Sequence, residues 1–558
     1  MQSATKVYLA IPDRRDAAAV RTALEGVMND LQSGTLAASD KSSLLRALMD
    51  DLGTEKPIWK SWDEQTYEVA LDCIKVLSRS QPCSSYLATA TGIKTLQYHA
   101  QNHLAGSTST RGTKAQKLAI SAICNTLLLY SSAPEICFKE GLGDWALREL
   151  DSQNAVTADD TWVFLMARVI MVLTSRPSYG FLEKFVDELS GLQLIEARLQ
   201  DAVQHSDFSS LAVIEYLKIL YHVFALYPED RGRDWDDRFD VFSALLIDFL
   251  LACPSTKLES PMTNVINVLT RLPSKSLNKV IDAAERLPRA ANVILDVTMA
   301  YVRATLPPPS WKPGDALPAS TYDQRAVDIL DETLPPAFLA LVNLIQADPI
   351  VRRKMKNRIL PPDLDRSTAA GPLEERANVL GYLLSFARST QHHITAAAAG
   401  ELLYVVCGEN AASLTDEIGY GNAAGILFHK GMGPPSKAEA TIEEIPDAEN
   451  VSTESPRNPI TGLVQETDEP RHPMADMSQE EKEREAEKMM ALFDRMVKNP
   501  AMQLMENPMK DAVRSGKIDD WEKSEGEKVL QNIREQEAQD EAEAAKEIME
   551  WKKRMGKA

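Results

Sequence analysis

Apolar residues recur every three or four positions from about residue 15 to residue 430. This spacing places them on one face of successive helices. Breaks containing Pro, Gly, Ser or Asp separate the helices at intervals of roughly 40 to 50 residues, the period of armadillo and HEAT repeats. The pattern predicts an all-α, armadillo/HEAT-like right-handed superhelical solenoid over residues 1–432, and an irregular helical domain is the alternative. The clearest stripes cover residues 69–77, 118–128, 211–221, 265–269, 338–345, 379–384 and 402–406.

The pattern changes after Gly433. Between Glu439 and Glu469 the chain has nine acidic residues, one arginine and few apolar residues. This composition predicts a flexible acidic linker over residues 433–477. Helical spacing then resumes, which predicts a C-terminal helical tail over residues 478–558. A proline-rich stretch, 305–322, predicts a surface loop within the solenoid, because proline lacks the N–H donor that a helix needs.

Composition narrows the class of protein. Aromatic residues make up only 6% of the chain, which favours packed helices over sandwiches or barrels. The net charge of −20 argues against a nucleic-acid partner, because an acidic surface repels phosphates. The six cysteines form no C-x-x-C pair, and the N-terminus lacks the features of a signal peptide. No apolar run approaches the roughly 18 residues of a membrane span, so we expect a cytoplasmic protein.

No catalytic constellation is evident in the sequence. It contains no P-loop, no G-x-S-x-G elbow, no H-E-x-x-H and no EF-hand loop. His392 and His393 are adjacent, so on a helix they point about 100° apart and are poorly placed to hold one metal ion. We therefore expect a binding protein with no chemical active site, no cofactor and no metal.

Three strings near the C-terminus carry more specific information. They are Gly-Tyr-Gly-Asn-Ala-Ala-Gly at 419–425, Asn-Pro-Ile-Thr-Gly at 458–462 and Ala-Leu-Phe-Asp-Arg-Met at 491–496. In this order, after a leucine-rich helical stretch, they resemble the synembryn family, also called resistance to inhibitors of cholinesterase. The first string either positions the tail or simply starts a helix, since glycines permit tight turns and close contacts. Its candidate residues are Gly419, Tyr420, Gly421, Asn422 and Gly425.

The resemblance implies a folding chaperone and non-receptor guanine nucleotide exchange factor for heterotrimeric G-protein α subunits (Gα). Such a protein has Gα as its partner, in the nucleotide-free or GDP-bound state. It stabilises nucleotide-free Gα and is released by GTP. In the family, the concave face of the solenoid holds the C-terminal helix of Gα, and the tail reaches the nucleotide-binding domain. We expect a monomer in the cytoplasm that is recruited to the cell cortex. The preferred class of Gα is not indicated.

The alternative function is a general armadillo-type adaptor or scaffold, for import or signalling, without exchange activity. Import adaptors carry regular ladders of Trp and Asn across many repeats. The eight tryptophans of this chain are scattered, and no such ladder is evident.

The resemblance also suggests partner-binding residues. Arg352, Arg353 and Lys356 lie in a basic segment, with Arg358, that would grip the terminal carboxylate and acidic side chains of the Gα helix. The alternative is a charge cluster that complements the dipole at a helix C-terminus before Pro361.

Further candidates lie on earlier repeats and in the tail. Arg79 and Asn125 would line the same groove, or cap helix ends. Tyr221 is a groove aromatic or a core residue. Leu492, Phe493 and Met496 would dock on Gα or fold back onto the solenoid.

Two hydroxyl residues in the acidic linker are candidate phosphorylation sites. Ser436 and Thr441 each have a glutamate three positions later, the pattern that acidophilic kinases use. A phosphate there would dock on a basic patch of the solenoid and order the linker.

Overall fold

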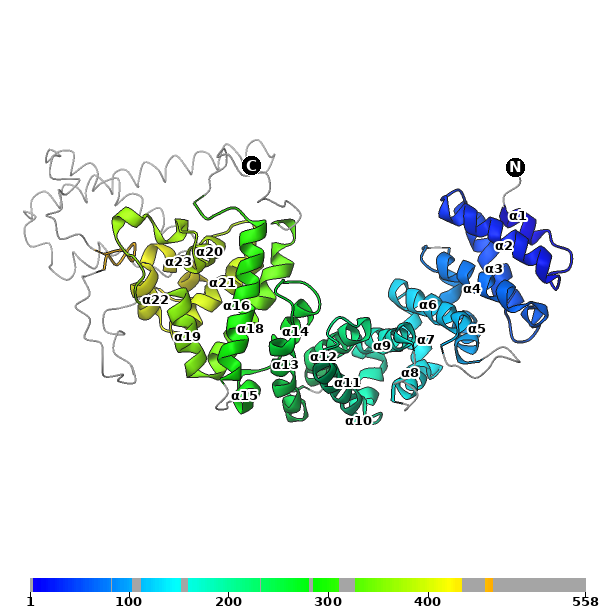
Figure 1. Cartoon of the computed structure of the whole chain (residues 1–558), viewed down its shortest axis with the longest axis horizontal. Helices are drawn as coiled ribbons and strands as arrows, with labels where there is room; N and C mark the ends of the chain where they lie inside the picture. Colours follow the sequence, from blue (N-terminus) through cyan, green and yellow to red (C-terminus); the bar gives the residue numbers. More distant parts are fainter. Residues whose placement is uncertain are drawn as a thin grey trace, which may run out of the picture. The chain divides into compact units, whose positions relative to one another are not determined.

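The structure is a computed structural model that describes residues 4–81, 83–102, 112–151, 159–230, 232–280, 285–310, 327–433 and 457–464. Within these ranges every regular element is an α-helix or a short 3-10 helix, apart from one isolated antiparallel bridge between Arg457 and Val464 (Figure 1). Contacts divide the chain into two units. All the helices of the described ranges belong to the first unit, which comprises residues 1–430 and 434–464. The all-α solenoid predicted from the apolar periodicity is therefore confirmed.

Consecutive helices form two packed layers. In the layer that we call the ladder layer, each helix contacts the next one along the chain. Its members are α2 (Ala17–Gln32), α4 (Glu64–Leu77), α6 (Lys114–Leu129), α9 (Asp160–Thr174), α12 (Leu211–Asp230), α14 (Met262–Leu269), α18 (Leu330–Ala347) and α21 (His393–Val406).

The second layer covers the other side of these helices. Each of its members packs against a helix of the ladder layer. They are α3 (Ala38–Asp51), α5 (Ala90–Gln101), α8 (Leu142–Asp151), α11 (Gly191–His205), α13 (Val241–Ala252), α16 (Arg286–Thr305), α19 (Pro349–Ile359) and α20 (Val379–Ala387). Shorter helices complete the unit: α1 (Ala4–Leu9), α7 (Ala133–Lys139), α10 (Phe181–Asp187), α15 (Ser274–Leu277), α22 (Ala411–Ile418) and α23 (Tyr420–His429).

Side-chain caps explain where several helices begin. The Asp63 carboxylate accepts the backbone N–H of Thr66 at the start of α4, at 2.8 Å. Thr113 and Gln116 form a capping box at the start of α6, and Asp348 with Pro349 starts α19. Each cap satisfies backbone donors that have no partner within the helix. Helix α16 ends at Thr305, where the proline-rich stretch begins, as predicted.

The core is continuous and mainly aliphatic, with local clusters of aromatic side chains such as that of Phe224, Phe239 and Phe242. Leu, Ile, Val and Ala side chains from both layers fill it, and all six cysteines are buried and unpaired. Burial raises the pKa of the Cys124 and Cys407 thiols to about 12, so both remain protonated and unreactive at neutral pH.

Helix α12 is an exception to the expectation that no segment resembles a membrane span. Among the described helices, its segment Leu211–Glu229 has the length and hydropathy to cross a membrane. Most of that segment is buried inside the protein, and α12 packs between α9 and α14. We therefore interpret α12 as a core helix of the solenoid.

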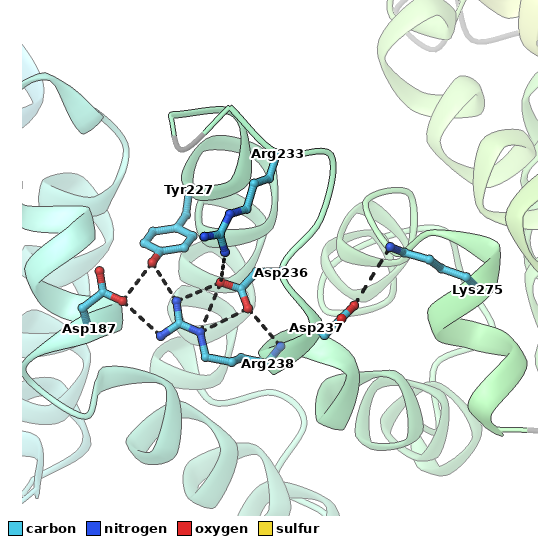
Figure 2. A network of polar contacts seen from close by, with 7 residues as sticks. All are labelled: Asp187, Tyr227, Arg233, Asp236, Asp237, Arg238 and Lys275. Carbon is cyan, nitrogen blue, oxygen red and sulfur yellow. Dashed lines mark hydrogen bonds and ion pairs between the residues drawn. The ribbon is translucent and has the colours of Figure 1, made fainter.

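A network of hydrogen bonds and ion pairs connects the end of α12 to neighbouring segments (Figure 2). Arg238, in the 3-10 helix η5 (Asp237–Asp240), donates to Asp236 at 2.8 Å, to Asp187 at 3.0 Å and to the Tyr227 hydroxyl at 2.7 Å. Tyr227, on α12, in turn donates to Asp187 at the end of α10, at 2.8 Å. The hydrogen bond from Arg238 helps to lower the pKa of Asp236. The network therefore ties the segment before α13 to two helices of the preceding repeat.

Candidate partner-binding site

Polar side chains join neighbouring helices of the ladder layer at their ends. At the first of these joints, Asn125 on α6 donates from Nδ2 to the backbone carbonyl of Lys75 at 3.3 Å and to Ser78 Oγ at 2.9 Å. The Ser78 hydroxyl donates back to the Lys75 carbonyl at 2.7 Å. The last carbonyls of a helix have no partner within the helix, so this arrangement caps α4 and fixes α6 against it.

The second joint repeats this geometry with a histidine. Thr174, at the end of α9, donates to the Met171 carbonyl at 3.0 Å. His222 on α12 places Nδ1 3.4 Å from Thr174 Oγ1 and hydrogen-bonds the backbone of Met171. Burial lowers the pKa of His222, so the ring is neutral at pH 7 and caps α9 without adding charge.

The third joint is the most fully bonded. Asn343 on α18 donates to three carbonyls at the end of α14, those of Leu269 at 3.2 Å, Thr270 at 3.1 Å and Leu272 at 3.0 Å. The Thr270 hydroxyl donates to the Asn267 carbonyl at 2.6 Å. Asn125, His222 and Asn343 therefore occupy equivalent places, and we call them the joint residues.

A sequence signal for these joints exists, but the prediction missed it. The three capped helices end in Val-Leu-Ser, Val-Leu-Thr and Val-Leu-Thr, at 76–78, 172–174 and 268–270. Successive copies lie 96 positions apart, the length of two repeats. A regular ladder of Trp and Asn does not describe these joints, because a histidine takes the place of asparagine at the middle one.

Two arginines lie directly after the capped helices. Arg79 follows Ser78 and is exposed, and within the described ranges no ion pair or hydrogen bond engages its guanidinium. Arg271 follows Thr270, donates to the Tyr221 hydroxyl at 2.6 Å and lies 4.9 Å from the centre of that ring. Tyr221 is half-buried: it packs against the core and also contacts Arg271. Neither arginine is neutralised by a carboxylate among the described residues.

The exposed face around the joints also carries leucines. Leu128 follows Asn125 by three positions and is 56% exposed. Leu339 precedes Asn343 by four positions and is 40% exposed. Residues three or four positions apart on a helix are neighbours on its surface. The ladder layer therefore presents leucines and unneutralised arginines together, a combination suited to an amphipathic helix with acidic groups.

The cations of α19 do not form one cluster. Lys356 pairs with Glu417 at 3.2 Å, and Arg358 points to another side, pairing with Asp296 at 2.6 Å. Arg352 and Arg353 are exposed. Among the described residues, Arg352 has no ion pair or side-chain hydrogen bond, and its Nη1 would lie 3.7 Å from a Cβ placed on Gly408. Of the four basic residues, Arg352 is therefore the one whose charge is most available to a partner.

Two of the three sequence motifs, residues 419–425 and residues 458–462, are in contact in the structure. Gly419 precedes α23, whose first backbone donors, on Tyr420 and Gly421, bond the carbonyls of Pro459 at 2.8 Å and Ile460 at 2.9 Å. A Cβ on Gly419 would lie 2.5 Å from the backbone nitrogen of Gly462. The glycine is thus required by contact with the second string.

The other residues of the first string have different roles. Asn422 is buried and donates to Ile418 O at 3.0 Å and Glu374 Oε2 at 3.3 Å. Gly425 is exposed, and no atom lies within 4 Å of a Cβ placed on it. Asn422 therefore holds the start of α23 in place. At position 425, by contrast, no close contact requires a glycine.

Several candidate residues lie outside the described ranges. They are Leu492, Phe493 and Met496 of the tail and the two hydroxyl residues Ser436 and Thr441. Their roles stay predictions. Within the described part of the chain, no group of three or more His, Cys, Asp or Glu residues is arranged to hold a metal ion.

Comparisons with known proteins agree on one family. A family model described as guanine nucleotide exchange factor synembryn (Ric8) matches residues 70–517. Chaperone Ric-8A of Gallus gallus is 24% identical over 481 residues, which cover 80% of this chain and 85% of the relative. Chaperone Ric-8A of Bos taurus is 23% identical over 460 residues, covering 78% and 82%. The Danio rerio protein of the same name is 31% identical over 179 residues, about a third of each chain. Because the family model spans most of the sequence, the chain belongs to the synembryn family of guanine nucleotide exchange factors.

Proposed function

We propose that this chain is a folding chaperone and non-receptor exchange factor for the α subunits of heterotrimeric G proteins. It acts as a monomer in the cytoplasm and binds the α subunit in its nucleotide-free state. The match to the synembryn family over residues 70–517 carries this proposal. The capped ladder layer supports it, because it supplies a rigid surface for binding and no constellation for covalent chemistry among the described residues.

Nucleotide exchange by this mechanism requires only that the chain bind one nucleotide state of Gα more tightly than another. A protein that binds nucleotide-free Gα more tightly than the loaded form must weaken nucleotide binding by the same factor. A tenfold preference corresponds to about 1.4 kcal/mol. GTP binding then favours the loaded form and releases the client by the same linkage. No residue needs to touch the nucleotide.

The proposed docking surface is the exposed face of the ladder layer together with Arg352 of α19, which lies beside Gly408 just after the ladder helix α21. A helix from the client would place apolar side chains on Leu128 and Leu339 and acidic groups near Arg79, Arg271 and Arg352. In a chain with net charge −20, arginines without acidic neighbours are suited to attract a carboxylate. Hydrogen bonds to charged groups contribute about 1.5–3 kcal/mol each, so a few such contacts provide useful affinity.

A charge-reversal experiment tests this surface. Replacing Arg352 and Arg353 together by glutamate should weaken Gα binding about 10- to 100-fold, because a charge-assisted contact becomes a repulsive one. The matched control is Arg15→Glu with Arg148→Glu, which makes the same change of charge at exposed positions before α2 and on α8, in repeats far along the chain from α19. Affinity is measured with GDP-bound and nucleotide-free Gα, and circular dichroism monitors helix content. Equal affinities for the two double variants would remove α19 from the proposed surface.

A further inference from the structure

Residues 457–464 pack against the solenoid, and we call this segment the strap. It lies inside the linker predicted from composition, yet it is packed against α22 and α23. Its sequence encodes a tight turn. Asn458 Oδ1 accepts the backbone N–H groups of Ile460 at 2.9 Å and Thr461 at 3.3 Å, and Gly462 adopts φ +70°. The strap is therefore a preformed loop, closed by the bridge between its first and last residues.

Backbone hydrogen bonds attach the strap to the solenoid. In the two bonds to the start of α23, strap carbonyls accept from backbone N–H groups that have no partner within the helix. At the other end of the strap, the Val464 N–H donates to the Arg366 carbonyl at 2.8 Å. Side-chain burial contributes little, since Ile460 is 64% exposed and only Leu463 is partly buried against the core. The strap is thus held mainly by directional bonds.

Arg366 is the residue of the solenoid that anchors the strap. Its guanidinium is 8% exposed and donates to the carbonyls of Gly462 at 2.9 Å and Glu417 at 2.6 Å. It also pairs with the Glu417 carboxylate at 2.7 Å. The same carboxylate pairs with Arg457 of the strap at 3.1 Å and with Lys356 at 3.2 Å. Glu417 therefore connects α19, α22 and the strap in one ionic network.

Two glycines make this contact possible. The backbones of Gly419 and Gly462 touch directly, and a Cβ on Gly462 would lie 2.8 Å from both Gly419 N and Ile418 C. Any side chain at residue 462 would collide with backbone atoms that cannot move without displacing α22. A substitution at Gly462 should therefore release the strap while leaving the helices of the solenoid intact.

We propose that the strap, held by Arg366 and the Gly419–Gly462 contact, sets the point at which the client-binding tail leaves the solenoid. With the strap docked, residues 457–464 are held against α22 and α23. Residues 465–477, about 13 positions, then connect it to the tail predicted from residue 478. With the strap released, the connection would start after Gly433 and comprise residues 434–477, about 44 positions. Arg366 and Gly462 are thus positioning residues that need no contact with the client.

This change of tether length has a calculable effect. For a random-coil tether, effective concentration falls with about the −3/2 power of its length. Lengthening the tether from about 13 to about 44 residues lowers the effective concentration of the tail roughly sixfold. The inference rests on the proposed function, because it requires solenoid and tail to bind the same Gα molecule. It adds that the strap, and not the end of α23, marks the origin of the tail.

The test compares four forms of the full chain, made in bacteria so that no phosphate is added. They are the unmodified chain, Gly462→Ala, Gly34→Ala, and Gly462→Ala with residues 434–456 deleted. Gly34 is a matched control, because it has φ +71° and no atom within 4 Å of an added Cβ. Hydrogen exchange of the Tyr420 and Gly421 amides reports strap release without any client. Affinity for purified nucleotide-free Gα reports tail positioning.

The expected results distinguish the proposed role of the strap from the proposed function of the whole chain. Gly462→Ala should expose the two amides and weaken Gα binding up to about sixfold, whereas Gly34→Ala should do neither. The deletion leaves about 21 residues in the released tether, so it should reduce the loss to about twofold although the amides stay exposed. Amides that stay protected in Gly462→Ala, or an exposed strap with unchanged affinity, would overturn the inference while leaving the proposed function intact. An unmodified chain that binds no Gα would instead refute the proposed function.

Discussion

The third joint of the ladder layer gives the sharpest prediction about stability. Replacing Asn343 by leucine keeps the size of the side chain but removes its N–H donors. Three carbonyls at the end of α14, at 3.0–3.2 Å from Nδ2, then lose their shared partner. Leucine cannot replace these bonds, and water has limited access because Asn343 is half-buried.

The cost follows from the number of bonds. An amide group has two protons, so at most about two full hydrogen bonds are lost, each with a net contribution of about 0.5–1.5 kcal/mol. A carbonyl left without a partner adds a desolvation cost of about 1–3 kcal/mol. The joint should therefore lose about 2–3 kcal/mol. In a repeat protein each repeat contacts only its neighbours, so the loss should stay local.

Hydrogen exchange resolved along the chain measures this loss directly. Amides in α14 and α18 should exchange roughly 30- to 150-fold faster in Asn343→Leu, because 1.4 kcal/mol corresponds to a factor of ten. Asn125→Leu should have a smaller effect on α4 and α6, since its contacts are fewer. The control is Asn357→Leu, at an exposed position on α19. An Asn343 variant that exchanges no faster than this control, or equally fast in every repeat, would refute the assigned role of the joint residues.

Two further predictions concern pH and the C-terminal boundary. Burial lowers the pKa of His99 from 6.5 to about 4, so the unfolded state binds a proton before the folded state does as the pH falls. The free energy of unfolding should therefore drop by about 2 kcal/mol between pH 6.5 and 5. In urea titrations, His99→Gln should flatten this dependence on pH. If the slope is unchanged in His99→Gln, another group titrates. A chain ending at Gly433 should exchange Gα nucleotide poorly and also lose protection at Tyr420, whereas a chain ending at Val464 should lose only the exchange activity. Full exchange activity in either truncated chain would contradict the proposed role of the tail.

The sequence predicted the helices well because their signal is local. Apolar residues spaced by three and four, together with proline-rich breaks, depend only on neighbouring positions, and the stripes through α4, α6, α12 and α18 all lie in helices. The basic segment was harder to interpret. Its cations are close in sequence, but α19 turns Lys356 toward Glu417 and Arg358 toward Asp296, which are remote along the chain.

Contacts between distant segments explain what sequence reasoning missed. Composition placed residues 457–464 in a flexible linker, because it could not show that Arg366 and Gly419 would receive them. Asn125 was a candidate from the sequence, but its two equivalents, His222 and Asn343, were overlooked for a related reason. Asn125, His222 and Asn343 share a place in the fold but not a residue type, and only their common targets at helix ends reveal the relation.

The central claim is selective affinity for an α subunit without nucleotide. The most direct measurement is the rate of GDP release from purified Gα proteins, with and without the full chain. The account predicts faster release, a stable complex when nucleotide is absent, and dissociation of that complex when a GTP analogue is added. Unchanged release from every Gα class, with no complex in either nucleotide state, would contradict it.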